Sequence, residues 1–214
     1  MRLVLPRLYV ILDAALLTIP DTDCAQKLAD AGVRLLQYRN KNASTREIFD
    51  ASKRFAALLL PQGVTFFVND RADVAALAGA SGVHVGQEDL GVEAARSVIG
   101  PGKLVGVSTH NREQFELAAA TSADYIAVGP VFATSTKANP DPVVGTDLLR
   151  QVRPLTDKPI VAIGGITLDR ATEAFEAGAD SVAVISDILL APDPGKRARQ
   201  YIERLEAAQR AAAL

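Results

Sequence analysis

The stretch EAGADSVAV, residues 176–184, combines three local patterns within a few residues. Its first residues are typical of a helix end, its glycine fits a helix C-cap, and SVAV is typical of a buried strand. Related stretches occur at three other places: ADAGVRLLQ at 29–37, AGASGVHVG at 78–86 and TSADYIAVG at 121–129. We expect Gly32, Gly82 and Gly178 to cap the helices that precede these strands. The repetition predicts a chain in which helices and strands alternate.

Short apolar runs continue this pattern along the whole chain. The runs are LYVILD (8–13), VRLLQYR (33–39), TFFVND (65–70), GVHVGQ (82–87), LVGVST (104–109), YIAVGP (125–130), PIVAIGG (159–165) and SVAVIS (181–186). Most are almost continuously apolar, as expected for parallel strands covered on both faces. Segments of helical period occur at 45–60, 168–177 and 193–208.

Strict alternation of strands and helices favours an α/β fold with a parallel sheet. Eight such units in 214 residues fit a (β/α)8 TIM barrel, with residues 1–214 forming a single catalytic domain. An open doubly wound sheet is the alternative, although such sheets usually contain fewer strands.

The composition excludes several classes of protein. The 23 basic and 25 acidic residues give a net charge of −2, which offers no electrostatic footprint for nucleic acid or an anionic membrane. Cys24 is the only cysteine, which excludes an intrachain disulfide and favours a reducing compartment, the cytoplasm. Pro6 and Arg7 interrupt the N-terminal apolar run, so we expect neither a signal peptide nor a membrane span. The oligomeric state stays open, a homo-oligomer included.

Basic residues gather after the second predicted strand. In a (β/α)8 barrel the active site is built from the carboxyl ends of the strands. Within QYRNK, residues 37–41, side-chain alternation places Gln37, Arg39 and Lys41 on one face, toward the mouth of the barrel. Lys137 adds a cation from a distant segment. Arginine and lysine together suit an anion with many oxygens, such as a diphosphate, whereas the alternative is an ordinary solvated strand edge.

Two carboxylates follow the next two predicted strands. Asp70 and Asp89 come after neighbouring strands of the expected barrel. Carboxylates beside a phosphate-binding mouth suit Mg²⁺, which takes few protein ligands and keeps water or phosphate oxygens. The alternative is that Asn69 and Asp70 cap the following helix, and that Asp89 caps a helix near Gly91.

A second anion site is predicted after the last two strands. Residues 164–167 (GGIT) and 184–187 (VISD) occupy the recurrent phosphate-binding position of this fold, although a tight turn would also explain the glycines. His84 is interpreted as a hydrogen-bonded residue of the barrel interior rather than a base. Asp13, Gln87 and His110 have no assigned role. Two histidines and one cysteine give little support for zinc, and no nucleotide-binding motif is present.

Eight short motifs, in order, resemble the thiamine phosphate synthase family. They are LYVILD, QYRNK, ND, VHVGQEDL, GVSTH, DYIAVGPVFATSTK, AIGGI and AVIS. The resemblance implies a (β/α)8 barrel and a Mg²⁺-dependent transferase of thiamine biosynthesis. Such an enzyme joins hydroxymethylpyrimidine diphosphate to a thiazole phosphate, expected in its carboxylated form. The products are thiamine phosphate and diphosphate, and the diphosphate leaves in a dissociative step.

The resemblance also implies roles for individual residues. For the pyrimidine diphosphate it implies Gln37, Tyr38, Arg39, Asn40, Lys41, Asn69, Ser108 and Lys137. The catalytic members of that set are Arg39, Lys41, Ser108 and Lys137. For the thiazole phosphate it implies Thr134, Ser135, Thr136, Gly165, Ile185 and Ser186. Asp70 and Asp89 are the implied ligands of Mg²⁺. Tyr38 stands where the family often has Trp.

Three other functions compete with this interpretation. A thiazole tautomerase-like barrel would need the phosphate-binding residues at 164–167 and 184–187. It would not need the cations Arg39, Lys41 and Lys137, which we call the diphosphate clamp. A non-catalytic barrel that binds a phosphate ligand would need neither the three cations nor the two carboxylates. A phosphosugar isomerase would need an acid and base pair, which the sequence does not offer. The combined set of cations and carboxylates therefore favours the synthase.

Overall fold

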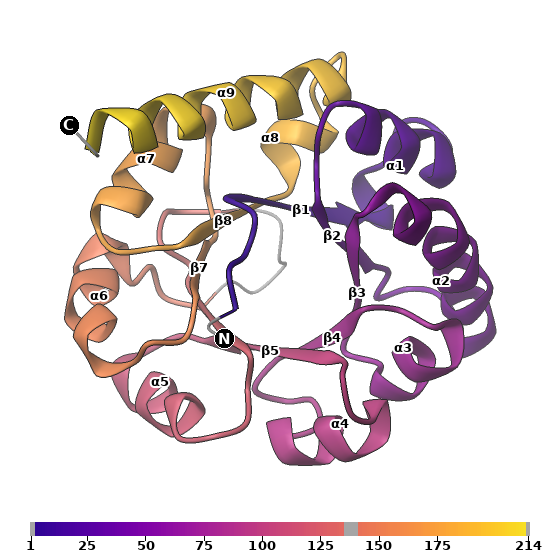
Figure 1. Ribbon diagram of the computed structural model, residues 1–214, viewed down its shortest axis with the longest axis horizontal. Coiled ribbons are helices and arrows are strands. Elements are labelled where there is room, and N and C mark those ends of the chain that lie inside the picture. The colour runs from indigo at the N-terminus through magenta and orange to yellow at the C-terminus, as the bar shows by residue number, and fades with distance from the viewer. Residues whose placement is uncertain (1–2, 135–140, 213–214) are drawn as a thin grey trace.

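The computed structural model describes residues 3–134 and 141–212, and it forms a closed barrel of parallel strands (Figure 1). The strands are β1 (Leu8–Asp13), β2 (Leu35–Arg39), β3 (Thr65–Asn69), β4 (Gly82–Val85), β5 (Leu104–Thr109), β6 (Tyr125–Val128), β7 (Ile160–Ile163) and β8 (Ser181–Val184). Each strand pairs with the next, and β1 also pairs with β8. The predicted (β/α)8 barrel is confirmed, and the open sheet is wrong.

Helices surround the barrel as an outer ring (Figure 1). The helices are α1 (Asp21–Asp30), α2 (Thr45–Leu59), α3 (Ala72–Ala78), α4 (Val92–Ile99), α5 (Arg112–Ala119), α6 (Gly145–Val152), α7 (Leu168–Glu176), α8 (Ser186–Leu189) and α9 (Pro194–Ala212). Three short 3-10 turns are η1 (Ala14–Leu16), η2 (Leu60–Gln62) and η3 (Arg153–Leu155). The short helix α8 directly follows β8 and was not predicted from the sequence.

Helix α2 shows why the segment after β2 becomes helical. Ser44 and Glu47 form a reciprocal capping box that satisfies backbone N–H groups at the start of the helix. Phe55 faces the sheet, where its ring centroid lies 4.8 Å from that of Tyr38 and 5.8 Å from that of Phe66. Removing a fully buried phenylalanine ring of this kind typically costs about 3–5 kcal/mol. Packing of the apolar face therefore holds α2 against β2 and β3.

Aromatic rings fill the interior of the barrel. Tyr9, Phe67 and Tyr125 are fully buried, and the ring centroids of Phe67 and Tyr125 lie 5.5 Å apart. Two glycines on neighbouring strands make room for them. A Cβ atom on Gly106 would lie 2.0 Å from the Tyr125 ring, and one on Gly82 would lie 2.5 Å from the Phe67 ring. The aromatic layer thus depends on strand positions without side chains.

The predicted capping role of Gly82 is wrong. Gly82 is the first residue of β4, whereas Gly79 ends α3 in a left-handed conformation with φ of 75°. Both glycines lie in the same short segment, and the local pattern does not separate the cap from the strand. A Cβ atom at Gly82 would lie 2.4 Å from the carbonyl oxygen of Leu104 on β5 and 2.5 Å from the Phe67 ring on β3, so both neighbouring strands keep this position small.

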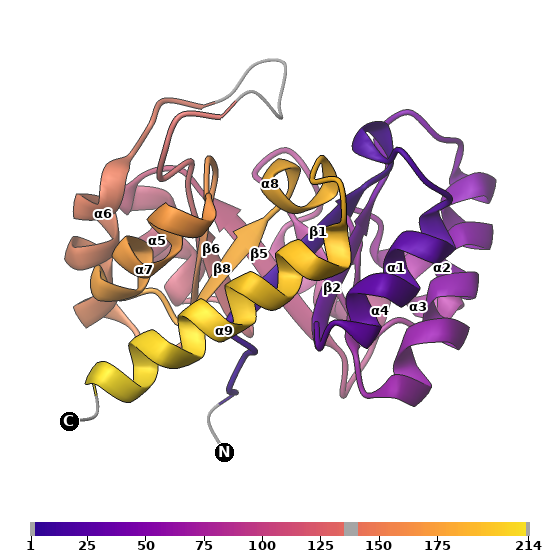
Figure 2. The same cartoon turned by 90° about the horizontal axis from the view of Figure 1, so that it is seen from above.

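The two ends of the barrel differ in chemistry. Residues before β1 cross the N-terminal end of the strands, and Leu5 packs there with Tyr9 and Leu35 in an apolar cluster. Figure 2 shows this N-terminal segment at one end of the barrel and α8 at the opposite end. In the described part of the chain, no helix has the length and apolar character needed to cross a membrane. The polar ends of the strands lie opposite the apolar cluster.

Candidate active site

Arg39 lies at the carboxyl end of β2 and is held by a carboxylate of β1. Its guanidinium forms an ion pair with Asp13, the residue beside it in the strand register. Asp13 is buried, and its second carboxylate oxygen accepts a hydrogen bond of 3.1 Å from the backbone N–H of Ala15. Sequence reasoning left Asp13 without a role, although its position at the end of the first strand was a usable signal. The ion pair thus holds the Arg39 guanidinium at the carboxyl ends of β1 and β2.

Lys41 joins the carboxylates that follow β3 and β4. Its ammonium group forms an ion pair with Asp70. Burial raises the pKa of the Asp70 carboxyl above its usual value, the hydrogen bond from Lys41 lowers it, and the neighbouring carboxyl of Asp89 raises it again. Asp70 has a left-handed backbone with φ of 63°, and its N–H donates to the carbonyl of His84 at 2.7 Å. Lys41, Asp70 and Asp89 thus form one charged cluster.

The alternative capping roles of these acidic residues are wrong. Helix α3 starts after Arg71 and helix α4 after Gly91, and neither helix has a side-chain cap. Asp89 instead accepts a hydrogen bond of 2.7 Å from the backbone N–H of Gly86, which holds the loop after β4.

The carboxylate pair fits a hard divalent cation. Two carboxyl groups in contact repel each other unless a cation or a proton lies with them, and Lys41 supplies the positive charge here. Within residues 3–134 and 141–212, no group of three or more His, Cys, Asp or Glu side chains gathers where a metal ion could be held. Asp70 and Asp89 would therefore give only part of a coordination shell, as suits Mg²⁺ that keeps water and phosphate oxygens.

Ser108, Gln37 and Asn69 come from three other strand positions on the inner face. Ser108 is held by β4 and the loop after it, since its Oγ lies 2.8 Å from Nε2 of His84 and its carbonyl accepts from Gln87 at 2.6 Å. Gln37 is buried within the barrel, whereas Asn69 is half-buried at the end of β3. His84 is hydrogen-bonded through both ring nitrogens, which agrees with its predicted interior role.

Tyr38 lies on the other face of the strand end, with Asn40 beside it. The Tyr38 ring packs against Phe55 in the layer between sheet and helices, and burial raises the pKa of its phenol. Asn40 donates a hydrogen bond of 3.2 Å to the Tyr38 hydroxyl. Because side chains alternate along a strand, Tyr38 is turned away from the face of Gln37 and Arg39. Tyr38 therefore packs in the layer between sheet and helices, Asn40 lies just beyond β2 beside it, and their role toward the pyrimidine diphosphate stays a prediction.

A separate pocket brings together residues from the loops after β6, β7 and β8. Thr134, Gly165, Ile185 and Ser186 all line this cavity of about 290 Å³. Ser135 and Thr136, predicted to act beside them, and Lys137, predicted to bind the pyrimidine diphosphate, lie outside the described residues. This pocket is therefore lined by residues of the two stretches predicted to form a second anion site. Backbone N–H groups at such turns can hold a phosphate.

Arg170 is a further residue of this pocket that sequence reasoning missed. It lies in the first turn of α7 and lines the cavity. Its guanidinium donates to the carbonyl of Gly165 at 3.2 Å and lies 5.0 Å from the centroid of the Phe132 ring. Its place shortly after the GGIT stretch, residues 164–167, was the available signal.

Gly165 is expected to tolerate no side chain. Its φ is 62°, and a Cβ atom would lie 2.3 Å from the carbonyl oxygen of Ala133. Gly165→Ala should combine a left-handed backbone penalty of about 1–2 kcal/mol with an overpacking cost of about 1–3 kcal/mol. We expect a lower free energy of unfolding, measured with denaturant, and a weaker affinity for the ligand of this pocket.

The matched control for this change is Gly63→Ala. Gly63 has φ of 72°, but a Cβ atom there would have no neighbour within 4 Å. Gly63→Ala should therefore lower the free energy of unfolding only by the left-handed backbone penalty. Equal losses at the two glycines would contradict the assignment of a tight approach between the loops after β6 and β7.

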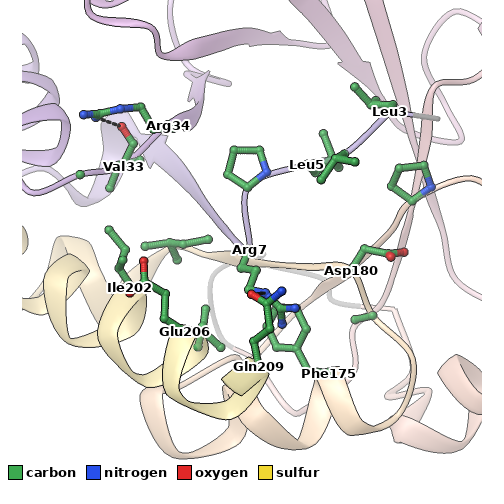
Figure 3. Close-up of a pocket in the computed structure, with 17 residues that line it drawn as sticks. Leu3, Leu5, Arg7, Val33, Arg34, Phe175, Asp180, Ile202, Glu206 and Gln209 are labelled. Carbon is green, nitrogen blue, oxygen red and sulfur yellow. Dashed lines mark hydrogen bonds between the residues drawn. The ribbon is translucent and has the colours of Figure 1, made fainter. Parts of the chain in front are cut away.

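Another cavity, of about 600 Å³, lies at the N-terminal ends of the strands (Figure 3). Its polar side chains are already engaged within the protein. Arg34 donates to the carbonyls of Ala29 and Val33 at 2.9 Å, and Arg7 donates to Gln209 at 3.1 Å. Because these groups serve the protein itself, the cavity lacks the convergent charges found at the other end of the barrel.

The fold and these charged groups define the class of the protein. It is a single-domain (β/α)8 barrel with charged side chains at the carboxyl ends of its strands, where enzymes of this fold have their active sites. Its residues 8–188 match the family model described as thiamine monophosphate synthase. The chain therefore belongs to the thiamine monophosphate synthase family, whose members are transferases of thiamine biosynthesis.

Relatives and a solved structure agree with this family. The chain is 52% identical over 208 residues to a thiamine-phosphate synthase of Koribacter versatilis, covering 94% of this chain and 96% of that protein. It is 44% identical over 195 residues to a thiamine-phosphate synthase of Chloroflexus aurantiacus, covering 91% and 90%. A thiamine phosphate pyrophosphorylase structure from Pyrococcus furiosus superposes with a TM-score of 0.85 at 35% identity, covering 94% and 96%.

Proposed function

We propose that this chain joins hydroxymethylpyrimidine diphosphate to a thiazole phosphate in its carboxylated form. The bond between the pyrimidine methylene carbon and the diphosphate oxygen breaks, and its electron pair leaves with the diphosphate. The thiazole nitrogen then donates its lone pair to the methylene carbon, and the thiazole carboxylate leaves as carbon dioxide; the electron pair of the broken bond stays on the ring carbon, which takes up a proton from solvent. The products are thiamine phosphate, diphosphate and carbon dioxide.

The observation that carries this proposal is the charged cluster of Lys41, Asp70 and Asp89 beside Arg39. Negative charge grows on the departing diphosphate, and cations fixed at that position stabilise the transition state more than the ground state. Arg39 is held by the buried Asp13, so its guanidinium is positioned before substrate binds. The same reasoning assigns a third cationic role to Lys137.

The carboxylates would hold Mg²⁺ in this mechanism. When bound by Asp70 and Asp89, the ion would neutralise part of the charge on the diphosphate oxygens. The Lys41 ammonium, which pairs with Asp70 in the absence of ligand, would then be available to the diphosphate.

The second pocket supports a separate position for the thiazole phosphate. Its lining by Gly165, Ile185 and Ser186 offers backbone and hydroxyl groups to a phosphate, and Arg170 adds a positive charge nearby. We assign the thiazole phosphate to this pocket and the pyrimidine diphosphate to the cluster around Lys41. Ser135 and Thr136 belong to the same proposal. With one cysteine in the chain, we assign the activity to the cytoplasm.

The test is a direct assay of the purified protein. We expect thiamine phosphate and diphosphate to form in equal amounts when both substrates and Mg²⁺ are present. Omission of either substrate, or chelation of Mg²⁺, should abolish both products. Binding of the thiazole phosphate without any diphosphate release would instead support a tautomerase-like barrel, and the proposed joining reaction would be wrong.

A further inference from the structure

A chain of hydrogen bonds crosses the interior of the barrel and ends at Ser108. The Gln37 amide donates to the Tyr9 hydroxyl at 2.7 Å, and the hydroxyls of Tyr9 and Tyr125 lie 3.0 Å apart. The Tyr125 hydroxyl lies 2.8 Å from Nδ1 of His84, and Nε2 of His84 lies 2.8 Å from Oγ of Ser108. The chain thus connects two residues of the proposed pyrimidine diphosphate site through three buried residues that have no role in it so far.

The amide at one end sets the direction of this chain. An amide N–H₂ group only donates, so the Tyr9 oxygen accepts from Gln37 and sends its own proton to Tyr125. Each phenol has one proton, so Tyr125 must then donate to Nδ1 of His84. The opposite direction would point the Tyr9 proton at the Gln37 donor. Burial raises the pKa of both phenols, which keeps them protonated and able to donate.

The direction of the hydrogen-bond chain determines whether Ser108 presents its hydroxyl proton or its oxygen lone pairs to the substrate. If Nδ1 of His84 accepts from Tyr125, the ring carries its proton on Nε2 and donates it to Oγ of Ser108. The serine hydroxyl proton is then directed away from His84, toward the mouth of the barrel. The reverse arrangement would present only serine lone pairs, which repel the oxygens of a diphosphate.

We propose that His84 is a positioning residue that makes Ser108 a hydrogen-bond donor to the pyrimidine diphosphate. The proposal rests on the function proposed above, in which Ser108 contacts that substrate. The backbone of Ser108 is also fixed, because its carbonyl accepts a hydrogen bond of 2.6 Å from Gln87. His84 therefore acts on the rotation of the Ser108 hydroxyl. Three interior residues, Tyr9, Tyr125 and His84, thereby acquire a part in the reaction without touching the reacting atoms.

The first test reads the tautomer of His84 directly. The chain has only two histidines, so ¹⁵N NMR of tag-free protein labelled in its imidazoles gives two sets of signals, and His110→Gln assigns them. We expect the His84 ring to carry its proton on Nε2 and to accept at Nδ1. A proton on Nδ1, or on both nitrogens, would overturn the proposal. Because this measurement uses the ligand-free protein, its outcome does not depend on whether the protein makes thiamine phosphate.

Two tyrosines provide a matched pair for the direction of the chain. Tyr125→Phe and Tyr9→Phe each remove one hydroxyl from the same aromatic layer. Only Tyr125→Phe removes the donor to Nδ1 of His84, so it should abolish the preference for the Nε2–H form. Tyr9→Phe removes the donor to Tyr125 but leaves Tyr125 able to donate to Nδ1, so it should weaken that preference without abolishing it. The same change of tautomer in both variants, or in neither, would contradict the proposed direction.

The second test is a double-mutant cycle on kcat. Ser108→Ala is expected to lower kcat about 100-fold, since it removes a donor to the developing negative charge. Tyr125→Phe should lower kcat about 10-fold with the KM for the thiazole phosphate unchanged. In a Ser108→Ala background the Tyr125→Phe change should cost nothing further, because its effect passes through the serine hydroxyl. Independent losses that multiply would show a general structural role and would overturn the proposal.

Discussion

Replacing Lys41 with alanine is expected to lower kcat for thiamine phosphate formation by about 100- to 1,000-fold while the protein stays folded. The ammonium group lies where negative charge grows as the diphosphate departs, so its removal raises the barrier of that step. The Lys41 side chain is 52% exposed but its partner Asp70 only 17%, and without Lys41 the Asp70 carboxyl can take up a proton, since burial and Asp89 already raise its pKa; we therefore expect a modest loss of folding stability. Steady-state release of diphosphate measures the first effect, and thermal unfolding measures the second.

Lys53→Ala is the matched control. Lys53 lies exposed on α2, away from the strand ends, and its loss changes the net charge by the same amount. We expect it to retain wild-type kcat. A Lys41→Ala enzyme that releases diphosphate at the wild-type rate would remove Lys41 from the proposed clamp.

Arg39 offers a less selective test of the same clamp, and the structure gives the reason. Its guanidinium neutralises the buried Asp13 carboxylate, so Arg39→Ala would leave that charge without its partner. Breaking a buried ion pair from one side typically costs about 3–5 kcal/mol, although partial exposure of Arg39 reduces this figure. Loss of activity in this variant would thus combine catalysis with stability, which is why Lys41 separates the two effects better.

Asp70→Asn is expected to lower kcat at least about 100-fold at a Mg²⁺ concentration that saturates the wild-type enzyme. The substitution keeps the size of the side chain but removes the charge that would hold the ion together with Asp89. Activity measured over a range of Mg²⁺ concentrations should show a large increase in the concentration needed for half-maximal rate. Unchanged activity at low Mg²⁺ would exclude Asp70 as a ligand.

The same variant should be more stable than the wild type in the absence of ligand at neutral pH. Burial raises the pKa of Asp70 in the folded protein, so its charged form is less favourable there than in the unfolded chain. This penalty is fully present above the raised pKa. It disappears as the pH falls below the ordinary carboxyl range, because Asp70 is then protonated in both states. Denaturant unfolding at neutral and acidic pH would measure the difference.

Asp73→Asn is the control for both readouts. Asp73 lies exposed at the start of α3 and pairs with Arg71 on the surface. It should change neither the Mg²⁺ dependence nor the rate, and its effect on stability should stay within about 1 kcal/mol. A stability gain in this variant equal to that of Asp70→Asn would indicate a general charge effect rather than relief of buried repulsion.

The strand ends were predictable because two local rules act there. Parallel strands covered on both faces read as apolar runs, and polar residues at the carboxyl ends of a barrel gather at one mouth. These rules identified Gln37, Arg39 and Lys41 on one face, and Asp70 and Asp89 after the next strands. The alternation that placed Arg39 inward also places the Tyr38 ring outward, against Phe55.

Other features depend on contacts between strands far apart in sequence. The pairing of Asp13 with Arg39 requires the register of β1 against β2, and the room for Phe67 requires Gly82 on the neighbouring strand. The link between His84 and Ser108 likewise requires β4 beside β5. None of these contacts produces a recognisable pattern in the local sequence. For this reason Gly82 was mistaken for a helix cap.

The sequence by itself determined the number and order of the strands, the closed barrel and the end at which charged side chains gather. These properties follow from the period of the apolar residues and from the turns between them, which are local. Only the tertiary structure decided which charges touch, which face each ring occupies and how Ser108 is held. Those contacts depend on the closure of the barrel and its register, and the packing of the aromatic interior selects that register by excluding the alternatives.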